Sequence, residues 1–149
     1  MAIKDFSNSL YFIDGVDGEY VEAAIITRTS SKELGYIRMF LYLKGSFNGE
    51  RMTLKLTDSL TSPTVTYTSD EVLLSDTGAS SDWLGWVRFD FDKEWLIDTE
   101  SYHLLFKVDN YTESASKYVG VCIDYPQFEG AGTGDLTDRG AKFQLFDFE

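Results

Sequence analysis

Two neighbouring stretches of this chain alternate hydrophobic and polar residues with a period of two. Their hydrophobic positions are Val87, Phe89 and Phe91 in the first stretch, and Tyr102, Leu104, Phe106 and Val108 in the second. Successive side chains of a β-strand point to opposite faces, so each stretch is expected to bury one face and expose the other to water. The pattern therefore predicts a pair of half-buried β-strands. No comparable pattern predicts a helix of more than one or two turns.

Further extended runs follow one another at intervals of about 8–12 residues, separated by polar or glycine-bearing segments. The predicted runs are Glu19–Arg28, Tyr36–Lys44, Arg51–Thr57, Thr64–Thr68, Glu71–Leu74, Leu84–Asp92, Ser101–Asp109, Lys117–Tyr125 and Ala141–Phe148. The segment Thr29–Gly35 is expected to be a loop, and Asn48-Gly49 has the residue types of a tight hairpin. The series predicts an all-β fold, a two-layer antiparallel β-sandwich of jelly-roll type with about eight or nine strands.

Two strands show how side chains are distributed over the faces. In Arg51–Thr57 the inward residues are expected to be Met52, Leu54 and Leu56, with Arg51, Thr53 and Lys55 facing water. Tyr36–Lys44 differs because both of its faces are apolar: Ile37, Met39, Leu41 and Leu43 form one face, and Tyr36, Phe40 and Tyr42 lie on the other. That strand is either central and covered on both sides, or its second face meets a partner or ligand. We take Tyr36, Phe40 and Tyr42 as candidate partner-contact residues.

Length and charge narrow the class of protein. The 149 residues suit a single domain, 1–149, with residues 1–18 as a lead-in that serves as an edge strand or docking arm. The net charge of −12 disfavours nucleic acid and anionic membrane surfaces as partners. No apolar run approaches the ~20 residues that span a bilayer. No apolar signal core is seen near Met1, so we expect synthesis in a cytoplasm.

Few residues are suited to catalysis. The single histidine, His103, lies on the strand face opposite Leu104, and no Ser or Cys motif accompanies it. The single cysteine, Cys122, cannot form an intrachain disulfide and is expected to be a small buried hydrophobe. One His and one Cys cannot fill a tetrahedral zinc site. We therefore assign no catalytic residue and expect a protein that is not an enzyme; a small esterase or glycosidase with paired carboxylates is a third hypothesis.

The sequence allows one metal. Asp14, Asp17 and Glu19 place three carboxylates within six residues, and calcium takes oxygen ligands of this kind. The alternative is that these are ordinary solvated turn residues. We expect no cofactor other than calcium.

Surface aromatics are the remaining candidates for ligand binding. A flat aromatic ring beside hydrogen-bonding side chains is a common way to hold a sugar. The candidates are Trp83, Trp86, Trp95 and Tyr111. The alternatives are packing in the core or against a neighbouring chain.

The order of these features resembles non-catalytic jelly-roll sandwiches of the carbohydrate-binding-module and galactose-binding-like type. The segments that carry the resemblance are Tyr36–Lys44, Asn48–Leu56, Trp86–Phe91 and Tyr102–Val108, within about residues 20–125. Domains of this appearance also occur in bacteriophage tail, fibre and capsid-decoration proteins. The resemblance implies a non-catalytic structural protein of a bacteriophage-like virion, made in the host cytoplasm, that docks to other virion proteins or to itself as a homo-oligomer. The alternative that it implies is a carbohydrate-binding module.

Overall fold

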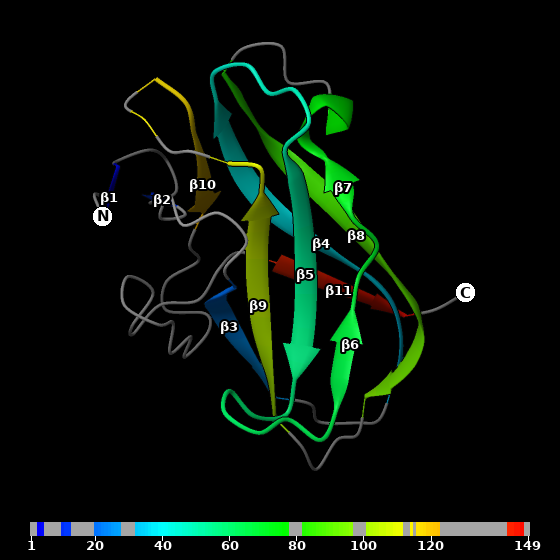
Figure 1. Cartoon of the computed structure of the whole chain (residues 1–149). Coiled ribbons are helices and arrows are strands. Elements are labelled where there is room, and N and C mark those ends of the chain that lie inside the picture. Colours follow the sequence, from blue (N-terminus) through cyan, green and yellow to red (C-terminus); the bar gives the residue numbers. More distant parts are fainter. Residues whose placement is uncertain are drawn as a thin grey trace.

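A computed structural model describes residues 3–4, 10–12, 20–27, 32–77, 82–96, 101–111, 114, 116–122 and 143–147. These residues form two antiparallel sheets that pack face to face (Figure 1), which confirms the predicted all-β sandwich. Sheet A contains β1 (Ile3–Lys4), β2 (Leu10–Phe12), β10 (Tyr118–Cys122), β4 (Lys32–Lys44), β11 (Phe143–Asp147) and β8 (Trp83–Leu96). Sheet B contains β3 (Val21–Thr27), β9 (Ser101–Asp109), β5 (Arg51–Thr57), β6 (Thr66–Thr68) and β7 (Val72–Leu73). The short 3₁₀ turn η1 (Leu74–Thr77) follows β7, and no helix in this part of the chain is long and apolar enough to cross a membrane.

The strand β4 is the centre of sheet A. It pairs with β8 along one side, from Lys32 opposite Leu96 to Leu43 opposite Trp83. On its other side it pairs with β11 and then with β10. The sequence allows this strand to be either central and covered on both faces, or open to a partner or ligand on one face. In the described residues β4 is central in its sheet, but its outward side chains are half-buried and not covered completely.

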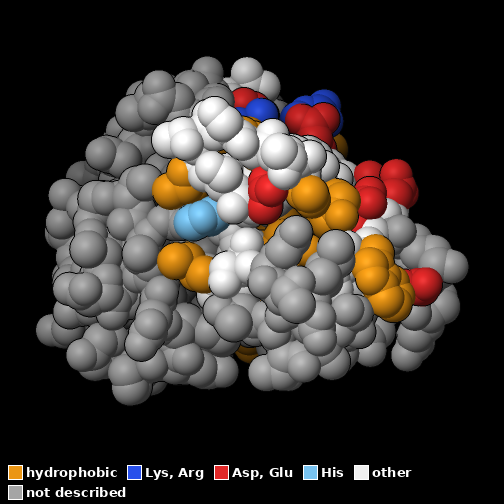
Figure 2. Space-filling view, turned by 90° about the horizontal axis from the view of Figure 1, so that it is seen from below, with side chains coloured by type: hydrophobic (Ala, Val, Ile, Leu, Met, Phe, Trp, Pro, Cys, Tyr) orange, Lys and Arg blue, Asp and Glu red, His pale blue; other side chains and the backbone are white. Residues whose placement is uncertain are grey.

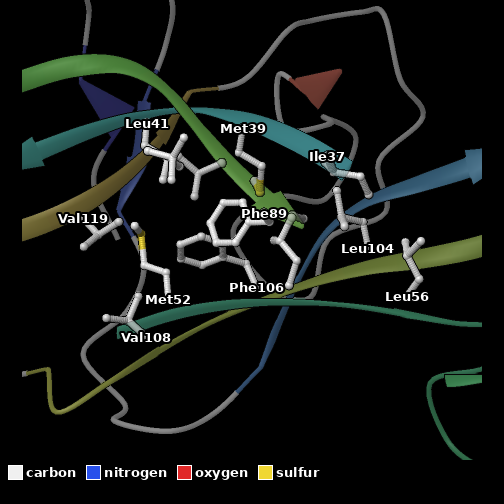
Figure 3. Packing of buried hydrophobic residues seen from close by; sticks show 14 of the residues in the cluster. Ile37, Met39, Leu41, Met52, Leu56, Phe89, Leu104, Phe106, Val108 and Val119 are labelled. Atoms are coloured by element: carbon white, nitrogen blue, oxygen red, sulfur yellow. The ribbon is translucent and has the colours of Figure 1, made fainter. Parts of the chain in front are cut away.

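The core lies between β4, β8 and β10 on one side and β5 and β9 on the other (Figure 3). Phe89 of β8 and Phe106 of β9 meet across the two layers with ring centroids 6.2 Å apart and an interplanar angle of 80°. Fully buried side chains around them are Ile37, Met39, Leu41, Leu43, Met52, Leu54, Leu56 and Leu104. Burying each such side chain stabilises the fold by roughly 1.5–3 kcal/mol, so this layer is the main favourable contribution.

Two strands are longer than the sequence predicts. The strand β4 begins at Lys32, within the expected loop Thr29–Gly35, and β8 runs on to Leu96. The register of the pair shifts between Leu34 and Tyr36, which marks a β-bulge. Because a bulge changes which side chains point inward, Leu34 and Leu96 are both wholly buried even though they break the simple alternation. Period-two counting therefore begins β4 too late and ends β8 too early.

The Asn48-Gly49 turn is not a hairpin. Gly49 does take the left-handed backbone (φ 92°) for which this residue pair is suited. The strands on either side, however, belong to different sheets, β4 to sheet A and β5 to sheet B. The turn carries the chain across the sandwich, and the tight-hairpin prediction is wrong at this point.

The outer face of sheet B is less exposed to solvent than the sequence predicts. Met52, Leu54 and Leu56 point inward as predicted, but Thr53 is only 4% exposed. Lys107 lies directly opposite Thr53 in the register. The ammonium groups of Lys55 and Lys107 converge on the ring of Tyr20, at 4.0 and 4.9 Å from its centroid. The methylene stems of these lysines can thus shield the threonine from water.

A buried carboxylate secures the crossing between the sheets. The Glu50 side chain is 3% exposed, forms an ion pair with Lys117, and accepts a 2.6 Å hydrogen bond from the Asn48 backbone N–H. Its backbone carbonyl accepts a 3.0 Å bond from Leu74 N–H of η1. Burial alone would raise the pKa of Glu50, but the hydrogen bonds from Lys117 and from Asn48 outweigh burial and hold this pKa below its ordinary value of 4.5.

Removing the cation should leave this carboxylate buried without its partner. We expect Lys117→Met to lower the free energy of unfolding by about 2 kcal/mol, less than the ~3–5 kcal/mol typical of wholly buried pairs, because Lys117 is partly exposed. The control is Arg51→Met, whose 3.9 Å pair with Glu71 is half-exposed and should contribute about 0–1 kcal/mol. Urea unfolding of both variants measures the difference; equal losses would mean that Glu50 gains nothing from Lys117.

The same pair predicts a pH dependence. Because the folded-state pKa of Glu50 lies below its unfolded value, the pair contributes fully above pH 4.5 and loses its contribution as pH falls through the folded-state pKa. The stability difference between the wild type and Glu50→Gln should therefore shrink between about pH 6 and about pH 3. Urea midpoints taken across this range test the effect, and a difference that stays constant would contradict it.

Candidate functional site: the aromatic face of sheet A

The outer side of β4 and β8 carries an unusual number of large rings. We call the part of this surface from Tyr36 to Lys44 and from Leu84 to Asp90, with Asp82 and Tyr118, the aromatic face; beyond the bulge, the register pairs Glu33 with Trp95. Its described side chains are Tyr36, Arg38, Phe40, Tyr42 and Lys44 from β4, Leu84, Trp86, Arg88 and Asp90 from β8, Asp82 just before β8, and Tyr118 from β10. Tyr36, Phe40, Tyr42 and Trp86 are half-buried, and Leu84 is 43% exposed. Rings in this state keep apolar area that a partner can cover.

The rings contact one another across the strands. Phe40 and Trp86 are directly opposite in the register, with centroids 5.1 Å apart in an edge-to-face arrangement. Tyr42 and Tyr118 lie 5.9 Å apart and are tilted by 51°. Such contacts hold the rings in fixed orientations. The rings form a strip across three neighbouring strands, with its β10 end buried because Tyr118 is 2% exposed.

Two arginines meet in the middle of this face. Arg38 and Arg88 are a cross-strand pair, a placement in which like charges are normally destabilising. Each is held over a ring: the Arg88 Cζ lies 3.8 Å from the centroid of Tyr36, and the Arg38 Cζ lies 5.2 Å from the centroid of Trp86. Arg88 also donates from Nε to Asp90 Oδ1 at 2.7 Å. Ring contact and this carboxylate offset part of the repulsion.

An ion pair lies beside Tyr118, at the end of the face where β4 ends. Lys44 Nζ donates to Asp82 Oδ2 at 2.8 Å, and Gly45 N–H donates to Asp82 Oδ1 at 3.2 Å. The bond from Lys44 lowers the pKa of Asp82, while burial, and then the charge of Asp82, raise the pKa of Tyr42. Both partners are substantially exposed, so the pair orients this end and adds little stability.

The structure places side by side residues that the sequence predicts for two different roles, sugar binding and partner contact. Trp86 is a candidate sugar-binding residue, and Tyr36, Phe40 and Tyr42 are candidate partner-contact residues; all four lie on the aromatic face. Trp83 does not join them. Its half-buried ring packs against the core, over the inward side of Gly85.

Trp95 lies beyond the bulge, opposite Glu33 of β4 in the register, and Tyr111 lies in the core. Trp95 is 51% exposed near the far end of β8, where its carbonyl accepts a 3.1 Å bond from the Tyr67 hydroxyl. Tyr111 is 1% exposed, and its hydroxyl accepts a 2.9 Å bond from Val119 N–H. Directly after β9, Asn110 takes a left-handed conformation (φ 58°), and Tyr111 lies in the core instead of on the surface. Its ring therefore offers no face to a sugar.

The remaining candidates do not form a second site in the described chain. Asp14, Asp17 and Glu19 lie outside the described residues, as does the side chain of Cys122. In the part that is described, no group of three or more His, Cys, Asp or Glu side chains is placed to hold a metal ion. His103 is half-buried on the outer side of sheet B, opposite Thr57, and Figure 2 shows the histidine between hydrophobic side chains at one end of the sandwich.

The Arg38–Arg88 pair is the feature that sequence reasoning missed. Alternation does place Arg38 with Tyr36 and Phe40, and Arg88 with Trp86, on outward faces. Their meeting depends on the register of β4 against β8, which period-two patterns leave open.

Searches against protein-family models, curated proteins and solved structures found no match. The case for a function therefore rests on the aromatic face.

The position of Trp83 gives a test of its structural role. A Cβ at Gly85 would lie 2.7 Å from Cζ2 of Trp83, so Gly85→Ala should force the ring to move and lower stability by about 1–3 kcal/mol. In a Trp83→Leu background the same substitution should cost less, because the obstructing ring is gone. Chemical unfolding of the four proteins of this double-mutant cycle measures the coupling; an unchanged cost would show that Trp83 does not depend on Gly85.

Proposed function

We propose that this protein is a non-catalytic structural protein that docks to other protein chains, a second copy of itself among them, through the aromatic face. The setting we propose is a bacteriophage-like virion, as a decoration, fibre or tail-associated component. The observation that carries the proposal is the gathering of Tyr36, Phe40, Tyr42 and Trp86 on one outer sheet face.

The composition of the face supports a protein partner. Tyr, Trp and Arg are enriched where protein interfaces bind most strongly, and a surrounding ring of polar groups excludes water from them. Here Arg38 and Arg88 lie among the rings, and the ion pair of Lys44 with Asp82 lies at one end. The face is thus a rigid amphipathic surface on a strand pair, which suits docking with little loss of conformational entropy.

Carbohydrate binding is the second candidate. The contact between Phe40 and Trp86, with Arg38 and Asp90 nearby as hydrogen-bonding groups, favours it. Against it, the guanidinium of Arg88 lies over the Tyr36 ring at 3.8 Å and occupies the ring face on which a sugar would stack. We therefore place protein docking first.

Self-association tests the docking proposal. The mass of the purified protein in solution, measured by light scattering over a concentration series, should rise from monomer to a discrete oligomer. Phe40→Ser and Trp86→Ser should each weaken association by about tenfold or more, as expected for central interface residues. The control is Leu60→Ser, because Leu60 is 47% exposed but lies outside the aromatic face. Unfolding midpoints confirm that each variant is folded.

Two results would count against docking. A wild type that stays monomeric at every concentration would remove the self-docking basis of the proposal. A monomer that binds a sugar on a glycan array, and loses it with Trp86→Ser, would assign the face to carbohydrate instead.

A further inference from the structure

The turn between β4 and β5 carries an exposed asparagine directly before a glycine. Within the described part of the chain, the one hydrogen bond of Asn48 is the 2.6 Å bond from its backbone N–H to Glu50 Oε1. The side-chain carboxamide of Asn48 has both donors and an acceptor, and no neighbouring group holds it. Its carbon Cγ is therefore open to attack.

The backbone nitrogen of Gly49 is equally accessible. Among the described residues, Gly49 takes part in hydrogen bonding only through its carbonyl, which accepts a 3.4 Å bond from Asn110 Nδ2. A glycine has no Cβ to shield this nitrogen, and beyond the two chain neighbours no atom lies within 4 Å of the place that a Cβ would take. The nitrogen of Gly49 and the carboxamide of Asn48, which adjoin each other in the chain, are thus both free to react.

We propose that Asn48 is a site of spontaneous modification, at which attack by the Gly49 backbone nitrogen removes the side-chain amide as ammonia. A bond forms between Gly49 N and Asn48 Cγ, the bond from Cγ to Nδ2 breaks, and Nδ2 leaves with the proton that the Gly49 N–H gives up. Water then opens the cyclic succinimide. Cleavage of the new bond gives aspartate, whereas cleavage of the original peptide bond gives isoaspartate, in which the chain runs through Cγ.

Asn110 provides a contrast within the same chain. Its side-chain Nδ2 is held by the Gly49 carbonyl at 3.4 Å. The next residue, Tyr111, is 1% exposed, and its hydroxyl accepts a 2.9 Å bond from Val119 N–H. The reacting groups at this position are therefore restrained, and the bulky side chain of Tyr111 hinders attack by its own backbone nitrogen. Asn110 should react much more slowly than Asn48.

The modification acts on the point where the chain crosses between the sheets. The Asn48 N–H donates to the buried carboxylate of Glu50, which also pairs with Lys117. Isoaspartate adds a methylene to the main chain between residue 48 and Gly49, so the turn should no longer hold this N–H against the carboxylate. Aspartate keeps the length of the main chain and adds a charge at an exposed position. Isoaspartate is therefore the product expected to weaken the crossing, and this inference is independent of the proposed docking function.

The first experiment follows the site in the intact, folded protein. Wild type is incubated under mildly alkaline conditions at physiological temperature, and peptide mass spectrometry measures conversion at Asn48 and at Asn110. Conversion at Asn48 should proceed within about tenfold of the rate in a capped peptide of residues 46–51, because the turn leaves both reacting groups free. Asn48→Gln should lack the added acidic form on ion exchange. A folded-state rate at Asn48 more than about tenfold below that of the peptide, or no faster than the rate at Asn110, would overturn the inference.

The second experiment tests the consequence for the crossing. Ion exchange separates the modified protein from the unmodified, and the Asn48→Asp variant supplies the aspartate form alone. Urea unfolding of the isoaspartate form should give a lower midpoint than that of the wild type or of Asn48→Asp. Treatment with an isoaspartyl methyltransferase, which returns isoaspartate toward aspartate, should raise the midpoint again. Equal midpoints for the isoaspartate form and Asn48→Asp would show that the crossing does not depend on this bond to Glu50.

Discussion

The pairing of β4 with β8 is the constraint on which both the core and the aromatic face depend. The ladder aligns Ile37 with Phe89 on the inner side and Phe40 with Trp86 on the outer side. Because side chains alternate, one register sets both faces at once, and a slip by one residue would turn the buried side chains outward. The wholly buried inner row makes such a slip very costly. The hydrophobic effect in the core thus fixes, as a consequence, which residues meet on the surface.

The chain order explains why this ladder needs support from elsewhere. Its two strands are separated in sequence by β5, β6 and β7, which belong to the other sheet. The chain must therefore cross the sandwich before β5 and again before β8. Glu50 connects the first crossing to Lys117 and to η1. Between β6 and β7, the Asp70 N–H connects sheet B to sheet A through a 2.8 Å bond to the Asp90 carbonyl of β8. These links hold the layers in place at points where no ladder joins them.

The fold class could be predicted because burial of one face makes hydrophobic and polar residues alternate along each strand, a period-two trace in the sequence. Arg51–Thr57 and Ser101–Asp109 are strands with the bounds that this trace predicts. The trace fails where the backbone departs from regular geometry, as at the bulge beside Leu34, or where a turn directs a side chain inward, as at Tyr111. It also says nothing about which strands are neighbours. The outward placement of Tyr36, Phe40 and Tyr42 was predictable, but their meeting with Trp86 and Arg88 required the three-dimensional register.

Stability alone does not account for the aromatic face. The inner row of β4 is already buried completely, so the core gains little from rings on the opposite side. Polar residues on that outer side would keep the protein more soluble, and they are what most antiparallel sheets carry on a solvent-exposed face. One ring is used by the fold, since Tyr118 is almost wholly buried. The half-buried Phe40 and Trp86 hold each other in fixed orientations, and each keeps part of its surface exposed. The opposed Arg38 and Arg88 add repulsion to this face, and their ring contacts and the Arg88–Asp90 ion pair offset part of it, so the face depends on the stability that the core supplies.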